Sequence, residues 1–122
     1  MRVAGTHVLL TGATGDIGRR LATRFSDAGA TVTLVARGRA ELEALAADVG
    51  GVAVPADLTD RTDLRGLIRE VERAHRPVDV LVNNAGTETA GHLTDLTPHE
   101  LEQLVILNLL APAELCRQVL PG

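Results

Sequence analysis

The sequence contains no tyrosine and no tryptophan, and its 12 basic side chains are all arginine, so lysine is absent too. It holds one cysteine, Cys116, and one serine, Ser26. A single cysteine excludes an internal disulfide and suits a reducing compartment, so we expect a cytoplasmic protein. Chemistry that needs a phenol or a primary amine cannot come from the side chains of these 122 residues.

Other absences exclude further partners. The arginines are scattered and the formal net charge is -4, so we do not expect nucleic acid to bind. The longest apolar stretch, residues 104–115, is interrupted by Asn108, Pro112 and Glu114, which makes it too short to span a membrane. The four histidines lack metal-ligand spacing, so no metal site is predicted.

What is present is an alternation of short β-branched runs with longer amphipathic stretches. The expected strands are His7–Thr11, Thr31–Ala36, Val52–Pro55 and residues 78–82. The expected helices are one ending near Gly29, residues 40–49, one with its N-cap at Asp60, and residues 98 to about 119; residues 88–96 are expected to form a polar loop. This alternation predicts one α/β domain over residues 1–122. It should hold a Rossmann-type parallel sheet in strand order 3-2-1-4, with helices on both faces.

A glycine turn, residues 12–18, joins the first strand to the first helix. Gly12, Gly15 and Gly18 would permit a tight turn, close approach to a pyrophosphate and close helix packing. The helix N-terminus would then face the anion. A turn that binds nothing is the alternative. The negative charge of Asp16 interacts favourably with the dipole at the N-terminus of the helix, but it would repel a pyrophosphate. We therefore expect Asp16 to cap the helix and face solvent. Ile17 is expected on the apolar face of this helix.

The end of the second strand indicates which dinucleotide is preferred. NAD-binding folds place an acid there to bind the ribose 2′-hydroxyl, but this strand ends in Ala36 followed by Arg37, with Arg39 nearby. A guanidinium suits a phosphate, so NADP is favoured over NAD; ordinary surface charges are the alternative. Asp57 could accept a hydrogen bond from adenine, or serve only its own turn.

Four motifs together resemble the short-chain dehydrogenase/reductase family: Thr-Gly-Ala-Thr-Gly-Asp-Ile-Gly at 11–18, Asp57-Leu58, Asn-Asn-Ala-Gly at 83–86, and Asn108. The resemblance covers the front half of a typical member. It implies that a nicotinamide dinucleotide is bound by Gly12, Ala13, Thr14, Gly15, Ile17, Gly18, Arg37, Asp57, Leu58, Asn84, Ala85 and Gly86. The glycine spacing resembles the extended, epimerase-like members, whereas the other motifs resemble the commonest subclass, so the subclass stays open.

Asn108 is expected on an apolar stripe with Leu101, Leu104 and Val105, where a polar side chain needs a partner. Pro112 lacks the N–H that would bond the Asn108 carbonyl, so this carbonyl is expected to be available. The resemblance implies that it holds a water in a proton relay; a simple helix kink is the alternative.

The family's catalytic Ser-Tyr-Lys arrangement has no counterpart in this chain, so these residues are expected beyond Gly122. The resemblance implies an NADP-dependent oxidoreductase that interconverts an alcohol and a carbonyl by hydride transfer, with this chain inactive by itself. A non-catalytic dinucleotide-binding module and an oligomerising half-domain are the alternatives. Without a fifth strand, the fourth strand is an open edge and the last helix is poorly covered. We therefore expect marginal stability or self-association into homo-oligomers.

Overall fold

The computed structural model describes residues 2–86 and 92–121 of the chain. Its strands are β1 (His7–Thr11), β2 (Thr31–Ala36), β3 (Val52–Pro55) and β4 (Val80–Val82). They form one parallel sheet in the order β3-β2-β1-β4, so the predicted topology is confirmed. The helices are α1 (Asp16–Asp27), α2 (Arg39–Val49), α3 (Arg61–Ala74), α4 (Pro98–Val105) and α5 (Ala111–Val119).

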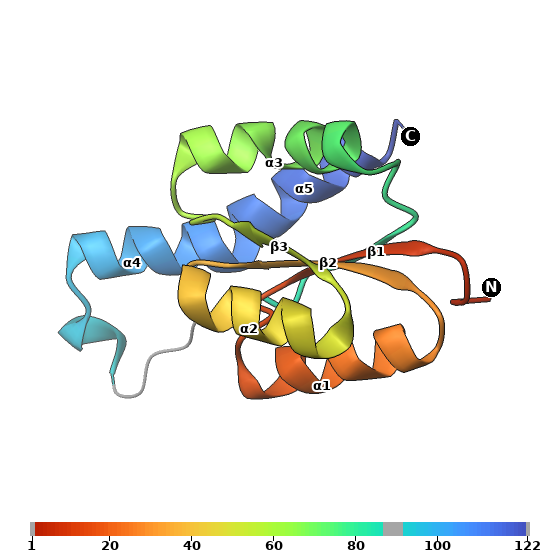
Figure 1. The fold of residues 1–122 in the computed structure, drawn as a ribbon. Helices are drawn as coiled ribbons and strands as arrows, with labels where there is room; N and C mark the ends of the chain where they lie inside the picture. Colours follow the sequence, from red (N-terminus) through yellow and green to blue (C-terminus); the bar gives the residue numbers. More distant parts are fainter. Residues whose placement is uncertain (1, 87–91, 122) are drawn as a thin grey trace.

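Helices cover both faces of this sheet, with α1 and α2 on one side and α3 and α5 on the other (Figure 1). Leu9 and Leu10 of β1 are both fully buried, but they belong to different cores. Leu9 packs with residues of α3 and α5, and Leu10 packs with residues of α1 and α2. Successive strand residues point to opposite faces, so a strand with consecutive apolar residues serves both cores.

The fourth strand is shorter than predicted. It begins at Val80 rather than at residue 78. The backbone N–H of Val78 donates to Glu72 Oε2 of α3 at 2.7 Å, and the Val78 side chain is buried beside that helix. The N–H of Asp79 then donates to the carbonyl of His7 at 2.9 Å, and the pairing with β1 begins with Val80 opposite Val8.

His7 is a fully buried structural histidine at the amino end of β1. Its Nε2 lies 2.8 Å from Thr33 Oγ1 of β2, and its Nδ1 lies 3.0 Å from the carbonyl oxygen of Arg76. Within the described residues, no group of three or more His, Cys, Asp or Glu side chains is arranged to hold a metal ion.

The last helix, predicted as one element over residues 98–119, is interrupted in the middle. It begins where Thr97 Oγ1 accepts a hydrogen bond from the N–H of Glu100 at 3.1 Å. Between α4 and α5 the chain forms a π-helical segment, Ile106–Leu110, in which the N–H of Ala111 bonds the carbonyl five residues back. Pro112 cannot donate and its ring crowds the preceding turn, which accounts for the wider winding.

The apolar stripe predicted for this helix is wrong. Leu101 and Val105 are 43% and 48% exposed, and Asn108 is exposed as well. The helix packs on the core through residues spaced by four: Leu107, Ala111 and Leu115. Asn108 directly follows Leu107 along the chain, so it lies beside that face rather than on it.

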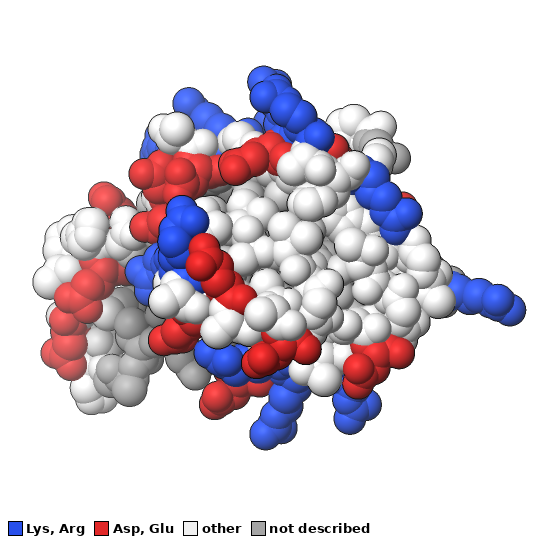
Figure 2. Space-filling model, in the orientation of Figure 1, with Lys and Arg blue, Asp and Glu red and all other residues white. Residues whose placement is uncertain are grey.

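Residues 92–96 of the predicted polar loop include a 3₁₀ turn, Leu93–Asp95, and residues 88–91 lie outside the described residues. Within residues 2–86 and 92–121, no helix combines the length and apolar composition that crossing a bilayer requires. On the face shown in Figure 2, acidic and basic side chains are interspersed rather than gathered by sign.

Candidate functional site

A cleft of about 910 Å³ lies at the carboxyl edge of the sheet, where open parallel sheets bind their ligands. Among the predicted site residues, those that line it are Gly12, Thr14, Gly15, Ile17, Arg37, Asp57, Leu58, Asn84, Ala85 and Gly86. Ala13 and Gly18 also belong to the glycine turn but are buried and do not line the cleft. Lining residues that the sequence reasoning did not assign to the site are Asp16, Val35, Ala36, Ala56, Thr59, Gln103 and Leu107.

Two glycines of the turn are required by packing. Gly12 has a φ of +63°, and a Cβ there would lie 2.8 Å from the backbone of Ala85, which follows β4. A Cβ on Gly18 would overlap the carbonyl oxygen of Gly12. The turn therefore lies directly against the end of β4, and α1 lies directly against the turn. Both features would be needed without any ligand.

Packing does not explain the glycine at position 15. Its φ of -74° suits any residue, and the nearest atom to an added Cβ would be 3.6 Å away, an ordinary contact. Gly15 is the N-cap of α1 and lines the cleft. Neither backbone conformation nor packing requires a glycine here, so close approach of a ligand is the remaining physical reason. The first N–H groups of α1 lack acceptors within the helix and can bond an anion.

The two residues after Gly15 differ from expectation. Ile17, predicted on the core face, is 66% exposed and forms a wall of the cleft. The helix begins at Asp16, so its core-facing positions are Gly18 and Ala22, both buried. Asp16 is exposed as predicted, but the N-cap is Gly15 and no side chain caps the helix. Asp16 therefore acts on α1 through its charge alone.

The hydroxyl of Thr11 joins the ends of β1 and β4. Its Oγ1 accepts hydrogen bonds from the N–H groups of Asn84 at 3.1 Å and Ala85 at 3.0 Å. The Asn84 side chain donates to the carbonyl of Gly12 at 3.1 Å, so it also ties the ends of the two strands together. Thr11 was missed as a site residue; the available signal was a polar residue ending an otherwise apolar strand.

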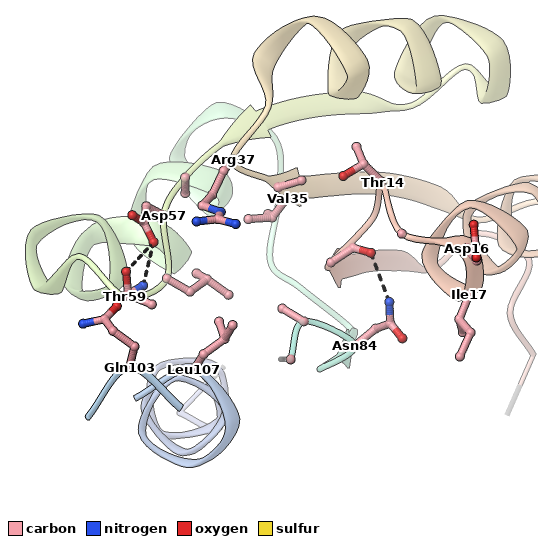
Figure 3. A pocket seen from close by; sticks show the side chains of 17 residues that line it. Thr14, Asp16, Ile17, Val35, Arg37, Asp57, Thr59, Asn84, Gln103 and Leu107 are labelled. Atoms are coloured by element: carbon pink, nitrogen blue, oxygen red, sulfur yellow. Dashed lines mark hydrogen bonds between the residues drawn. The ribbon is translucent and has the colours of Figure 1, made fainter. Parts of the chain in front are cut away.

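One end of the cleft is charged. Arg37 and Asp57 lie close together there (Figure 3), while Arg39 pairs with Glu43 at 3.4 Å and does not line the cleft. Asp57 Oδ1 accepts from Thr59 N–H at 2.9 Å and from Thr59 Oγ1 at 2.7 Å. The hydroxyl bond is the main reason that the pKa of Asp57 is lowered; burial opposes it, and Arg37 adds to it. Asp57 is therefore a carboxylate that both forms its own turn and faces the cleft.

The last helix forms one wall of the cleft through Gln103 and Leu107. Asn108 does not line the cleft, but it approaches its rim. A Cβ added to Gly86 would lie 2.8 Å from Asn108 Oδ1, so the Asn-Asn-Ala-Gly segment admits Asn108 because it ends in glycine. The positions of Gln103 and Leu107 at the cleft wall and of Asn108 beside Gly86 depend on how the last helix packs. None of them followed from the sequence.

These features suit an elongated phosphorylated ligand. The helix N-terminus and Arg37 can bind phosphates at two separated places, and Asp57 offers a hydrogen-bond acceptor beside Arg37. The volume is in the range of cofactor sites, which reach roughly 1,000 Å³. The described walls carry no tyrosine, lysine or histidine that could exchange a proton with a substrate.

Comparisons with known proteins agree with this geometry. A fatty acyl-CoA reductase of Mycobacterium tuberculosis is 33% identical over 98% of this chain and 43% of its own length. The ketoacyl reductase HetN of Nostoc is 34% identical over 98% of this chain and 44% of its own length. The chain thus spans less than half the length of these curated relatives.

Solved structures show the same similarity. A metagenomic short-chain oxidoreductase in complex with NADP superposes with a TM-score of 0.89 at 34% identity, covering 99% of this chain and 57% of that one. A short-chain dehydrogenase from Sphingobium yanoikuyae in complex with NADPH gives 0.87 at 36% identity, covering 95% and 48%. The family model for short chain dehydrogenases matches residues 6–122, and the chain belongs to that family.

Proposed function

We propose that residues 1–122 form the NADP(H)-binding part of a cytoplasmic oxidoreductase that interconverts an alcohol and a carbonyl by hydride transfer. The observation that carries this proposal is the position of Arg37. It follows β2, where an acid would bind the 2′-hydroxyl of NAD, and it lines the cleft beside Asp57. The structural relatives bound to NADP and NADPH support the same cofactor.

In this proposal each part of the cofactor has its own set of residues. The pyrophosphate lies over the glycine turn. The residues of this turn assigned to it are Gly12, Ala13, Thr14, Gly15, Ile17 and Gly18. The 2′-phosphate bonds the guanidinium of Arg37. Asp57 and Leu58 flank the adenine, and Asn84, Ala85 and Gly86 flank the adenosine ribose.

The bound cofactor would supply the hydride, whereas the proton must come from elsewhere. The chain has no tyrosine or lysine, so we propose that residues outside these 122 supply the general acid. Asn108, close to Gly86, would support the proton relay by holding a water. We therefore expect this chain to bind the dinucleotide without turning it over. A non-catalytic dinucleotide-binding module is the second candidate, and the absence of tyrosine and lysine from these 122 residues favours it.

The test is a titration with NADPH and with NADH, followed by nicotinamide fluorescence. The chain has no tryptophan or tyrosine, so little protein emission interferes. Unsubstituted protein should bind NADPH more tightly than NADH. Arg37→Ala should lower NADPH affinity at least tenfold, because a charge-assisted bond contributes roughly 1.5–3 kcal/mol, and leave NADH affinity unchanged.

Arg39→Ala is the matched control, since Arg39 is two residues away and pairs with Glu43 outside the cleft. It should leave both affinities unchanged. Tighter binding of NADH would reject the cofactor assignment, and binding of neither dinucleotide would reject the function.

A further inference from the structure

Gln103 of α4 brings an unpaired amide to the charged end of the cleft. It is half-buried, and it lines the cleft together with Arg37, Asp57 and Thr59. Figure 3 shows its side chain reaching from the last helix toward Thr59, on the side of the cleft where Asp57 lies. The amide forms no hydrogen bond with any other described residue.

An amide in this position has unused bonding capacity. A glutamine side chain offers two N–H donors and one carbonyl acceptor, and removing them from water without partners costs free energy. The adjacent Leu104 and the nearby Leu107 are also half-buried, so apolar side chains flank Gln103 along the last helix, while Arg37, Asp57 and Thr59 share the cleft with it. A ligand edge that presents a donor beside an acceptor would satisfy this amide.

The group across from it narrows the choice of ligand edge. Asp57 Oδ1 is already bonded to the backbone and hydroxyl of Thr59, which fixes the orientation of the carboxylate. A carboxylate only accepts hydrogen bonds. The two side chains therefore suit a group with two N–H bonds and a ring acceptor next to it, which describes the amino edge of adenine. Glutamine is known to pair in a bidentate manner with the amino group and N7 of adenine.

We propose that Gln103 selects adenine in the bound dinucleotide. Its carbonyl accepts one hydrogen of the adenine amino group, its amide donates to the adjacent ring nitrogen, and Asp57 accepts the second amino hydrogen. This assignment rests on the proposed dinucleotide site. It makes α4 part of that site. It also implies that the amino group of adenine determines which base the site prefers.

The experiment compares NADPH with reduced nicotinamide hypoxanthine dinucleotide phosphate, which carries a carbonyl oxygen in place of the amino group. Both ligands are followed by nicotinamide fluorescence. The unsubstituted chain should prefer NADPH, because the hypoxanthine oxygen would face the Asp57 carboxylate. Gln103→Leu should lower NADPH affinity roughly tenfold. It should lower the affinity for the hypoxanthine ligand less, because that ligand keeps the ring nitrogen but lacks the amino group, so the preference for NADPH should narrow.

Glu102→Leu places the same side chain one position earlier, at an exposed residue that does not line the cleft, and should change neither affinity. Gln103→Glu retains the size and one acceptor but loses the donor, and should also weaken NADPH selectively. It keeps the test available if the leucine variant does not fold.

Two outcomes would overturn the assignment alone: Gln103 variants that bind NADPH as tightly as the unsubstituted chain, or variants that lose both ligands equally. An unsubstituted chain that binds neither ligand would overturn the proposed function, and the assignment with it.

Discussion

The glycines of the turn after β1 separate what the fold requires from what a ligand requires. Gly18→Ala would force a methyl group against the carbonyl of Gly12, so α1 would have to shift. We expect it to lower the free energy of unfolding by about 3 kcal/mol, as overpacking against rigid backbone does. A fall in the thermal midpoint would show it, and an unchanged midpoint would contradict the close packing described.

Gly15→Ala should behave in the opposite way. The site has room for a Cβ and an ordinary φ, so alanine should retain or raise stability by about 0.5 kcal/mol through the unfolded state. NADPH affinity should nevertheless fall, because the methyl group stands where the pyrophosphate approaches. Thermal melting and dinucleotide titration of the same sample would check both parts. A variant that binds normally would mean that Gly15 has no role in ligand approach.

Asp16 carries an unfavourable charge at the same place. It is exposed in the first turn of α1 and lines the cleft. Asp16→Asn should raise NADPH affinity about threefold at low salt, since repulsion between exposed charges is modest and screened over about 10 Å at 0.1 M salt. The gain should shrink as salt is added. An effect that is independent of salt would point to a hydrogen bond rather than to charge.

At this scale, residues in recognisable motifs were predictable and residues brought in by packing were not. Arg37 and Asp57 were predicted because each directly follows a strand of a parallel sheet, whose carboxyl ends share one edge. Gln103 could not be predicted, because its approach to Asp57 depends on how the last helix lies across that edge. Asn108 was placed on the wrong face for the same reason.

Among the elements, α3 offers a direct test of a helix cap. Asp60 Oδ1 accepts hydrogen bonds from the N–H groups of Thr62 at 2.8 Å and Asp63 at 3.1 Å. Asp60→Ala should cost about 1 kcal/mol of stability, measured by chemical denaturation. Asp60→Asn is the matched control, because asparagine caps equally well and only the charge is removed. Equal losses in the two variants would attribute the effect to charge rather than to the cap.

A second element, α5, should show a pH-dependent contribution from Glu114. Hydrogen bonds from Arg117 and then Gln118 lower the pKa of Glu114 from 4.5 to about 2. A carboxyl with a depressed folded pKa stabilises the fold above its unfolded pKa, and this contribution is lost as pH falls from 4.5 toward 2. Glu114→Gln should therefore be less stable than the unsubstituted chain at neutral pH, with the difference vanishing near pH 2. A difference that is constant with pH would contradict this origin.

The boundaries of strands and helices could be predicted where a local sequence signal sets them, and could not where tertiary packing sets them. The limits of β1, β2 and β3 matched because short apolar runs bounded by turn residues define buried strands without further context. The fourth strand was over-extended because Val78 is buried against α3 and the pairing with β1 begins only at Val80, a tertiary arrangement with no local signal. The π-helical segment could not be read from Pro112, since a proline in a helix predicts a break or kink without specifying its winding.

For the molecule as a whole, we expect self-association through the last helix. Leu101, Val105 and Leu109 are 43%, 48% and 66% exposed, and β4 pairs only with β1 in the described sheet. Neighbouring exposed apolar side chains and an unpaired strand edge both favour association. Sedimentation should show a mass that rises with concentration, and Val105→Glu with Leu109→Glu should reduce it. A chain that is monomeric at every concentration would contradict the expectation.

The cleft draws its walls from the turns after all four strands and from the last helix, which begins at Pro98. A ligand bound there would contact all of these segments at once and would restrain their motion relative to one another. Amide hydrogens of α4 should then exchange with solvent more slowly when NADPH is present, although the glycine turn is remote from them in sequence. At a ligand concentration of a hundred times Kd the linkage amounts to about 2.7 kcal/mol. Exchange that requires release of the ligand would slow by up to about a hundredfold.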